Sequence, residues 1–183
     1  KIVAWEVHEA ESGDLARRLV ERALLREGCW LDPPVLHSDN GAPMTSYTLK
    51  ARLADLGMLM SHSRPRVSND NPYSESLFRT VKYCPEWPSK GFQSLTAVRD
   101  WMLAFEDAYN EQHLHSGIRF VTPADRHRGT DYERLAHRKM VYERAKRRNP
   151  RRWSGPTRNW EVTGPVSLNP GKLQEIERNK LAA

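Results

Sequence analysis

In its N-terminal half the chain alternates between short apolar stretches typical of strands and longer amphipathic stretches typical of helices. The strand patterns are "KIVAWEVHE", "PPVLHS" and "MLMSHS", and a helical pattern follows each of them. A β-α-β-α-β order of this kind indicates a sheet domain with helices around it rather than a helix bundle. The sequence therefore predicts the α/β fold class.

The expected helices carry end signals. The first two have a serine at the N-cap and a glycine just past the end: Ser12 with Gly28, and Ser46 with Gly57. A third begins at "NPYSES", where asparagine precedes a proline in the first helical position. It is expected to bury Leu77, Phe78 and Val81. The fourth starts near Ser94, with a buried stripe of Leu95, Val98, Met102, Phe105 and Tyr109.

Positive charge is concentrated toward the C-terminus. The chain has a formal net charge of +6, but positions 126–158 hold twelve Lys and Arg against three Asp and Glu, a local +9. A strongly basic segment on a mildly acidic body indicates a polyanionic partner, most simply nucleic acid. A solvated tail without any partner explains the charge equally well.

Other sequence features exclude some classes of protein. No apolar run approaches the roughly 18 residues of a membrane helix, and no secretory signal pattern opens the chain. The two cysteines, Cys29 and Cys84, form no CxxC unit, so neither a zinc site nor a disulfide framework is indicated. A reduced, cytosolic setting fits best. Because the first residue is Lys1, we expect the chain to begin inside a longer polypeptide.

Two carboxylates lie where an α/β domain often binds ligands. Asp39 directly follows the predicted strand "PPVLHS", Glu75 falls in the first turns of the helix after a polar loop, and 35 residues separate them. Two such groups can converge on Mg²⁺, which prefers hard oxygen ligands. Ordinary structural roles are open as well. Asp39 can form an Asx turn with "NG", and Glu75 can interact with the helix dipole or pair with Arg79.

Three stretches carry a resemblance to a known family: "HSDNG", "SRPRVSNDNPYSESLFRTVKY" and "YNEQHLHSGIRFVTPADRHRG". They resemble the integrase-type catalytic core of bacterial insertion-sequence transposases, in the DDE superfamily that includes retroviral integrases. The segment "RWSGPTRNW" and the later "LNP" resemble the tail of some members. The resemblance implies a ribonuclease H-like mixed sheet flanked by helices. It also implies DNA transposition and integration by metal-dependent phosphodiester cleavage and strand transfer.

The resemblance also implies roles for single residues. Asp39 corresponds to the second catalytic aspartate and Glu75 to the catalytic glutamate, and both are expected to bind Mg²⁺ or Mn²⁺. Lys82 matches a basic position of the family that is expected to contact DNA, and the spacing places Arg79 on the same helix face. Arg64 and Arg66, on either side of Pro65, are expected to contact DNA as well, although a solvated loop explains them equally well. The implied partners are the DNA of the element ends and of the target. A homo-oligomer on that DNA is expected, in the bacterial cytoplasm and away from any membrane.

The family pattern includes a third carboxylate, an aspartate on a strand ahead of "KIVAWEV". We therefore expect an N-terminally truncated core over residues 1–127, lacking its first two strands, followed by a basic C-terminal extension over residues 128–183. Glu6 and Glu9 lie on the wrong strand to replace the missing aspartate, and Asp70 is expected to be a loop or capping residue. This chain alone is expected to be catalytically inactive.

Other residues and other functions stay open. His37 precedes Asp39 by two positions and can share its side of a strand, although a structural histidine is the simpler interpretation. Trp153 and Trp160 alternate with arginines, as residues that stack on nucleic acid do, but packing of the tail explains them equally well. The alternative function is a non-catalytic nucleic-acid-binding remnant of a transposase.

Overall fold

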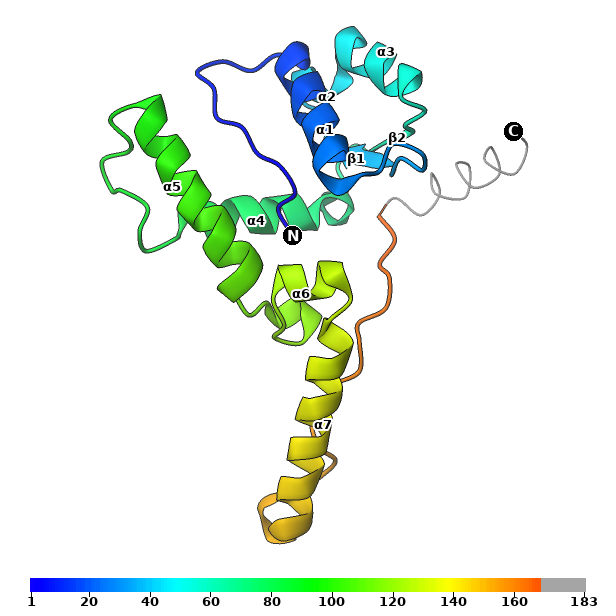
Figure 1. Cartoon of the computed structure of the whole chain (residues 1–183), viewed down its shortest axis with the longest axis vertical. Coiled ribbons are helices and arrows are strands. Elements are labelled where there is room, and N and C mark those ends of the chain that lie inside the picture. Colours follow the sequence, from blue (N-terminus) through cyan, green and yellow to red (C-terminus); the bar gives the residue numbers. More distant parts are fainter. Residues whose placement is uncertain (169–183) are drawn as a thin grey trace, which may run out of the picture. The chain divides into compact units, whose positions relative to one another are not determined.

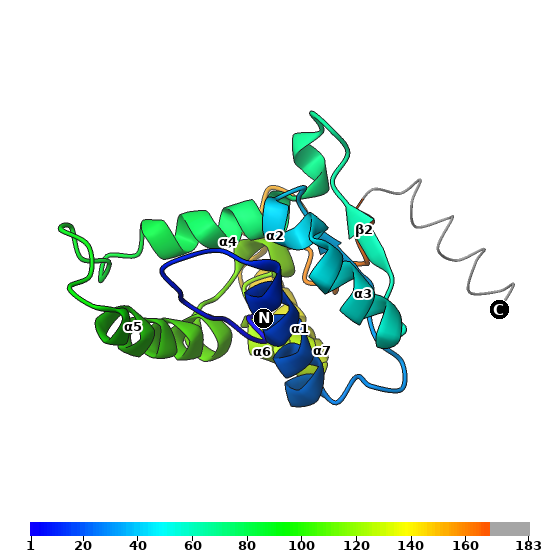
Figure 2. The same ribbon diagram turned by 90° about the horizontal axis from the view of Figure 1, so that it is seen from above.

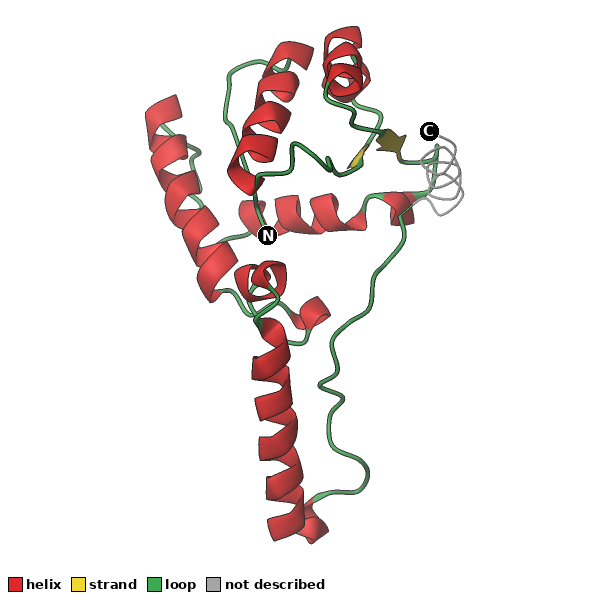
Figure 3. Cartoon of the chain, turned by 45° about the vertical axis from the view of Figure 1, so that its right-hand side comes forward, coloured by secondary structure: helices red, strands yellow, loops and turns green. Residues whose placement is uncertain are grey.

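The computed structural model of the chain describes residues 1–168, and it is mixed α/β, mostly helical with one small parallel sheet in this part of the chain (Figures 1 and 3). Strands β1 (Leu36–Ser38) and β2 (Met60–His62) are parallel, with Leu36 opposite Met60. The connection between them contains α2 (Ala42–Thr45) and α3 (Tyr47–Asp55), as a parallel pair requires. The predicted α/β class is confirmed at this level.

The other helices in the described part are α1 (Gly13–Glu27), α4 (Pro72–Lys82), α5 (Leu95–Asp107), α6 (Pro123–Arg128) and α7 (Asp131–Arg148). A π-helical turn, η2 (Ala108–Gln112), continues α5, and the 3₁₀ turns are η1 (Ser68–Asp70), η3 (Ser116–Ile118) and η4 (Pro150–Arg152).

The chain forms two compact units. One consists of Lys1–Ile2 and Asp100–Pro165, and the other is built mainly from Val3–Arg99. These units are the parts of the chain that pack most closely within themselves. The expected boundary between residues 127 and 128 marked the start of a basic extension, and it stays a prediction.

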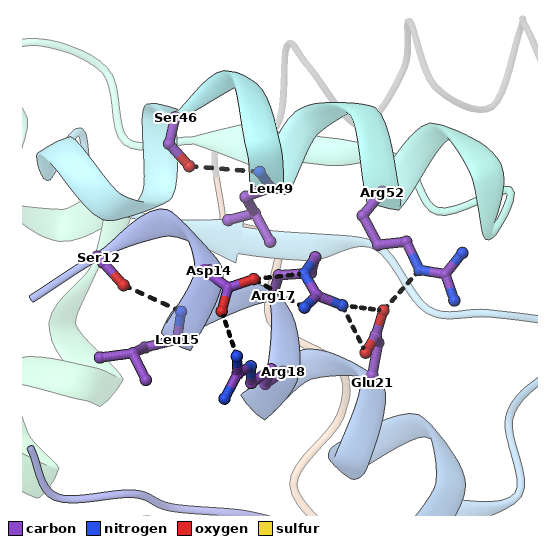
Figure 4. A network of polar contacts seen from close by, with 9 residues as sticks. All are labelled: Ser12, Asp14, Leu15, Arg17, Arg18, Glu21, Ser46, Leu49 and Arg52. Carbon is purple, nitrogen blue, oxygen red and sulfur yellow. Dashed lines mark hydrogen bonds and ion pairs between the residues drawn. The ribbon is translucent and has the colours of Figure 1, made fainter.

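The helix ends agree with the sequence signals. The Ser12 hydroxyl accepts the Leu15 N–H at 3.2 Å, and the Ser46 hydroxyl accepts the Leu49 N–H at 3.3 Å (Figure 4). Gly28 adopts the left-handed conformation with φ of 68°, which a glycine tolerates without cost from a side chain. These caps are confirmed because they depend on residues only three or four positions apart.

The core of the Val3–Arg99 unit lies between α1, α3 and the sheet, which belong to one part of the chain in Figure 2. Its buried residues are Leu24, Leu49, Leu53 and Met58. Polar contacts border this core, since Glu21 of α1 accepts hydrogen bonds from Arg17 and from Arg52 of α3 (Figure 4). Exposed ion pairs of this kind contribute little, so burial of the leucines holds the two helices together.

The strand expected over "KIVAWEVHE" is wrong, because residues 1–8 form no strand. Side chains take up the backbone groups of this segment instead. Asn110 bonds both the N–H and the carbonyl of Ile2, at 2.8 and 2.9 Å. The carbonyls of Trp5 and Val7 accept from Arg22 and Arg99. A strand needs a neighbouring backbone, and no strand lies beside this segment within residues 1–168.

The buried face expected for α4 is also wrong in part. No residue of α4 is buried, Phe78 is 63% exposed, and Leu77 and Val81 are half-buried. The reason is that Phe78 lines an open cavity. The stripe expected on α5 fits better, since Phe105 is buried and stacks on Trp101 with 5.1 Å between ring centroids.

The other unit has its own core, in which Trp160 packs with Val121 and Leu135. Trp160 is 6% exposed and meets the Tyr142 ring edge-on at 5.1 Å. Packing, rather than a free stacking surface, is therefore the role of Trp160. Of the tail motif "LNP", Asn169 and Pro170 lie outside the described residues, as does the basic extension from residue 169 onward.

We expect Leu49→Ala to lower the free energy of unfolding by about 2–5 kcal/mol, because Leu49 is completely buried and its truncation leaves a cavity. Urea denaturation followed by circular dichroism measures the change. Tyr47→Ala is the control on the same helix, at a side chain that is 86% exposed, and it should change stability by less than about 0.5 kcal/mol. Equal effects of the two substitutions would contradict the assigned core.

Candidate active site

Asp39 follows the end of β1 and lies at the carboxyl end of the two-stranded sheet. Its Oδ1 accepts the Gly41 N–H at 3.0 Å, so the Asx turn considered from the sequence does form. The ladder continues past β2 through Ser63, whose N–H donates to the Ser38 carbonyl at 2.9 Å. Asp39 is nevertheless exposed, and the turn engages only one of its two carboxylate oxygens. The turn therefore orients the carboxylate and leaves an oxygen for a ligand.

Glu75 lies in the first turn of α4 and is exposed. Its own backbone N–H donates to the Asn71 carbonyl at 3.4 Å, which begins the helix. The pair with Arg79 that the spacing allowed does not form, because the Arg79 guanidinium lies 6.0 Å from the centre of the Tyr83 ring. Within residues 1–168 no cation neutralises Glu75, so its carboxylate is available to a ligand.

Asp39 and Glu75 line the same cavity, which has a volume of about 860 Å³. Apolar walls come from α1 and α4, including Leu15, Leu19 and Phe78. The two predicted residues therefore open into one space although 35 residues separate them in the sequence.

Two further carboxylates line this cavity, Glu6 and Glu11. Glu6 is paired with Arg22 at 3.0 Å and with His8 at 2.9 Å. Sequence reasoning set Glu6 aside and did not single out Glu11, because the path of the N-terminal segment depends on tertiary contacts. In the described part of the chain no three His, Cys, Asp or Glu side chains form a group that could hold a metal ion.

The two arginines beside Pro65 have different surroundings. Arg64 donates to both oxygens of the Asp70 carboxylate, through Nε and Nη2 at 2.8 Å each. Arg66 is exposed and has a positive φ of 64°, and it has no ion pair among the described residues. All four residues expected to contact DNA, Arg64, Arg66, Arg79 and Lys82, are exposed, and Arg64 differs in being paired with Asp70. Their contacts with DNA stay predictions.

Asp70 is the residue whose importance the sequence did not reveal. It is 2% exposed, and Arg64 binds it through side chain and backbone. These hydrogen bonds lower the pKa of Asp70 to about 2. His37 also helps to hold Asp70 in place. Its Nε2 lies 2.7 Å from the Asp70 backbone carbonyl, and its Nδ1 lies 3.1 Å from the Ser61 hydroxyl. The structural interpretation of His37 therefore holds.

The basic segment divides into a paired part and an unpaired part. Several cations up to Lys139 are neutralised by nearby acids, as in Arg126 with Asp131 at 2.6 Å and Arg128 with Glu111 at 3.0 Å. Five exposed arginines at the end of α7 and in η4 have no ion pair within residues 1–168. We call them the arginine tip: Arg144, Arg147, Arg148, Arg151 and Arg152. They lie where the chain turns back after α7 (Figure 1).

Part of the chain is similar to known proteins. Residues 56–123 match the family described as the integrase core domain, and this range includes Glu75. The chain is also 27% identical, over 129 residues, to the transposase for insertion sequence element IS904 of Lactococcus lactis subsp. lactis (strain IL1403). The aligned region is 68% of this chain and 49% of the relative, so the chain spans about half the length of that transposase.

We expect the Arg64–Asp70 pair to make the free energy of unfolding fall as the pH is lowered into the acid range. Because folding lowers the pKa of Asp70 from about 3.8 to about 2, its contribution is complete above pH 4 and is lost as the pH falls toward 2. Asp70→Asn should lower stability at pH 7 and should flatten the loss between pH 4 and pH 2, measured by urea denaturation at each pH. Asp55→Asn, at an exposed carboxylate, is the control for net charge. Identical acid dependence of Asp70→Asn and the unmodified protein would contradict the prediction.

Proposed function

We propose that the chain carries an integrase-type core of the kind found in bacterial insertion-sequence transposases, and that it is the catalytic region of a DNA transposase. The observation that carries the proposal is that Asp39 and Glu75 line one cavity, on a strand end and on a helix, and that neither has an ion pair within residues 1–168. The proposed reaction is cleavage and joining of DNA phosphodiesters, on element ends and target DNA in the bacterial cytoplasm.

The proposed fold is ribonuclease H-like. Its support is the parallel pair β1–β2 with a helical crossover, which is compatible with an integrase core. In this proposal the two further strands of the family would lie beside the edge of β1 that is not paired with β2. They would separate β1 from the N-terminal segment that holds "KIVAWEV".

The donor set fits Mg²⁺ or Mn²⁺. Asp39 and Glu75 offer hard oxygen ligands, and Mg²⁺ is commonly held by one or two carboxylates together with waters and substrate phosphates. A bound ion supplies stabilisation of negative charge on the phosphate during cleavage and joining. In our proposal the Gly41 N–H keeps the Asp39 carboxylate oriented, and Lys82, Arg79 and Arg66 hold the DNA backbone. Phosphate contacts of this kind position DNA without reading its sequence.

We also propose that residues 1–183 alone do not join DNA. The family resemblance implies three carboxylates, whereas the part of the chain described by the structure has no group of three metal-binding side chains. The arginine tip favours a second candidate, nucleic-acid binding without catalysis, because phosphate binding by arginine needs no metal.

Catalysis is tested by joining a pre-cut element end to a plasmid with Mg²⁺ or Mn²⁺. We expect no joining by residues 1–183, and joining once a segment with the strand-borne aspartate that the family resemblance implies is fused ahead of Lys1. Glu75→Gln in the fusion should lower the rate by at least about 10²–10³-fold, because charge stabilisation depends on preorganised groups. Glu133→Gln on α7 is the matched control and should retain the rate. Metal-dependent joining by residues 1–183 that Glu75→Gln abolishes would contradict the proposed requirement for a third carboxylate.

DNA affinity is tested by the salt dependence of binding to a duplex, followed by fluorescence anisotropy. Replacing Arg147, Arg148 and Arg151 with glutamine should flatten the slope of log K against log salt by about 2–3, since each phosphate contact contributes roughly 0.9. The control replaces Arg18, Lys50 and Lys90, which are exposed and change the net charge equally. Equal slopes for the two triple variants would show that net charge, and not the arginine tip, sets the affinity.

A further inference from the structure

The loop between β2 and α4, residues 63–71, connects the two elements that place the candidate carboxylates. Asp39 is fixed relative to β2 by the parallel ladder, because Ser63 continues the hydrogen bonding of β2 to β1. Glu75 is fixed relative to the start of α4. The conformation of this loop therefore sets where Glu75 lies with respect to Asp39.

Asp70 joins three parts of this region. Its carboxylate accepts the Arg64 backbone N–H at 2.8 Å, in addition to the two bonds from the Arg64 guanidinium. Its own N–H donates to the Val67 carbonyl at 3.3 Å, and its carbonyl is bonded to His37 of β1. Arg64, Val67 and His37 of β1 thus all bond Asp70: Arg64 bonds its carboxylate, whereas Val67 and His37 bond its backbone N–H and carbonyl.

The loop needs such a restraint because part of its backbone is strained. The Val67 N–H bonds back to the Arg64 carbonyl at 3.2 Å, which closes a turn with Pro65 and Arg66 at its centre. Arg66 has a φ of 64°, a left-handed conformation that a residue with a side chain rarely adopts. The contacts of Asp70 add to this one hydrogen bond and tie the end of the loop, just before α4, to Arg64 and β1.

We infer that Asp70 is a positioning residue. Together with Arg64 it holds the loop in the conformation that opens Glu75 into the same cavity as Asp39. In this assignment Arg64 acts inside the protein and Arg66 is the arginine of the loop that faces DNA. The inference rests on the proposed function, since it concerns the metal affinity of Asp39 and Glu75.

The chemistry of the pair explains why a carboxylate is needed at position 70. A carboxylate accepts from the planar fork of an arginine and from a backbone N–H at the same time. An asparagine would direct an NH₂ donor at one of the Arg64 donors, so one contact would become repulsive. A lysine at position 64 would keep the positive charge but lose the fork.

The test measures Mn²⁺ binding by the decrease of the free-ion EPR signal, at a temperature where circular dichroism shows each variant to be folded. Asp70→Asn and Arg64→Gln should weaken Mn²⁺ binding about tenfold or more, in the range found when residues that support metal ligands are removed. Arg64→Lys should weaken Mn²⁺ binding less than Arg64→Gln does, because it keeps the positive charge. Arg66→Gln should leave Mn²⁺ binding unchanged and weaken duplex binding, whereas Arg64→Lys should leave duplex binding unchanged.

Glu75→Gln separates this inference from the proposed function. If Glu75→Gln does not alter Mn²⁺ binding, the proposed metal site fails and the inference fails with it. If Glu75→Gln abolishes binding while Asp70→Asn and Arg64→Gln stay within twofold of the unmodified protein, the metal site stands and the positioning role of Asp70 is overturned. Should Asp70→Asn fail to fold, the graded loss from Arg64→Lys to Arg64→Gln decides the question.

Discussion

The parallel pairing of β1 and β2 is the constraint on which the cavity depends. Each strand has three residues, and the ladder places Ser38 opposite His62, directly before Asp39 and Ser63. So short a ladder is weak by itself, and the leucines of α1 and α3 cover it. Each level of structure thus depends on the one before it. Burial of the leucines holds the helices together, the helices stabilise the short strands, and the end of β1 places Asp39 at the cavity.

A second constraint is the partition of charge. Three cations of the basic segment, Arg126, Arg128 and Arg134, pair with buried carboxylates of the protein itself. Asp125 is 3% exposed and lies 3.0 Å from Arg134, and Asp131 is 4% exposed and bound by Arg126. A buried carboxylate without a cation would be costly, so these arginines serve the fold first. The local charge of +9 therefore overstates the charge that a partner meets, and the arginine tip is the part that stays available.

The loop before α4 contains both features that the sequence predicts and features that it does not. Asn71 and Pro72 predict the start of a helix, and α4 does begin at Pro72. The prediction is confirmed because such signals depend only on residues close together in the sequence. Arg64 and Arg66 look alike in the sequence and both are exposed, yet Asp70 holds Arg64, whereas Arg66 has no ion pair within residues 1–168. In the same way Phe78 fitted an apolar helical face, but the structure sets a cavity against that face, so it remains exposed. A pattern gives the face of a helix and does not give what covers it.

By itself the sequence determined the helix ends, the two strands of the sheet, the placement of Asp39 and Glu75 on a strand end and a helix, and the resemblance to integrase-type cores. Each of these depends on neighbours within a turn or on the order of motifs. Only the tertiary structure decided that residues 1–8 form no strand and that Glu6 and Glu11 share the cavity with the expected pair. It also decided which arginines are neutralised, as in Arg128 with Glu111, 17 positions away. The reason is that hydrogen-bond partners and counter-charges come from segments far apart in the chain, and spacing along the sequence does not record which of them meet.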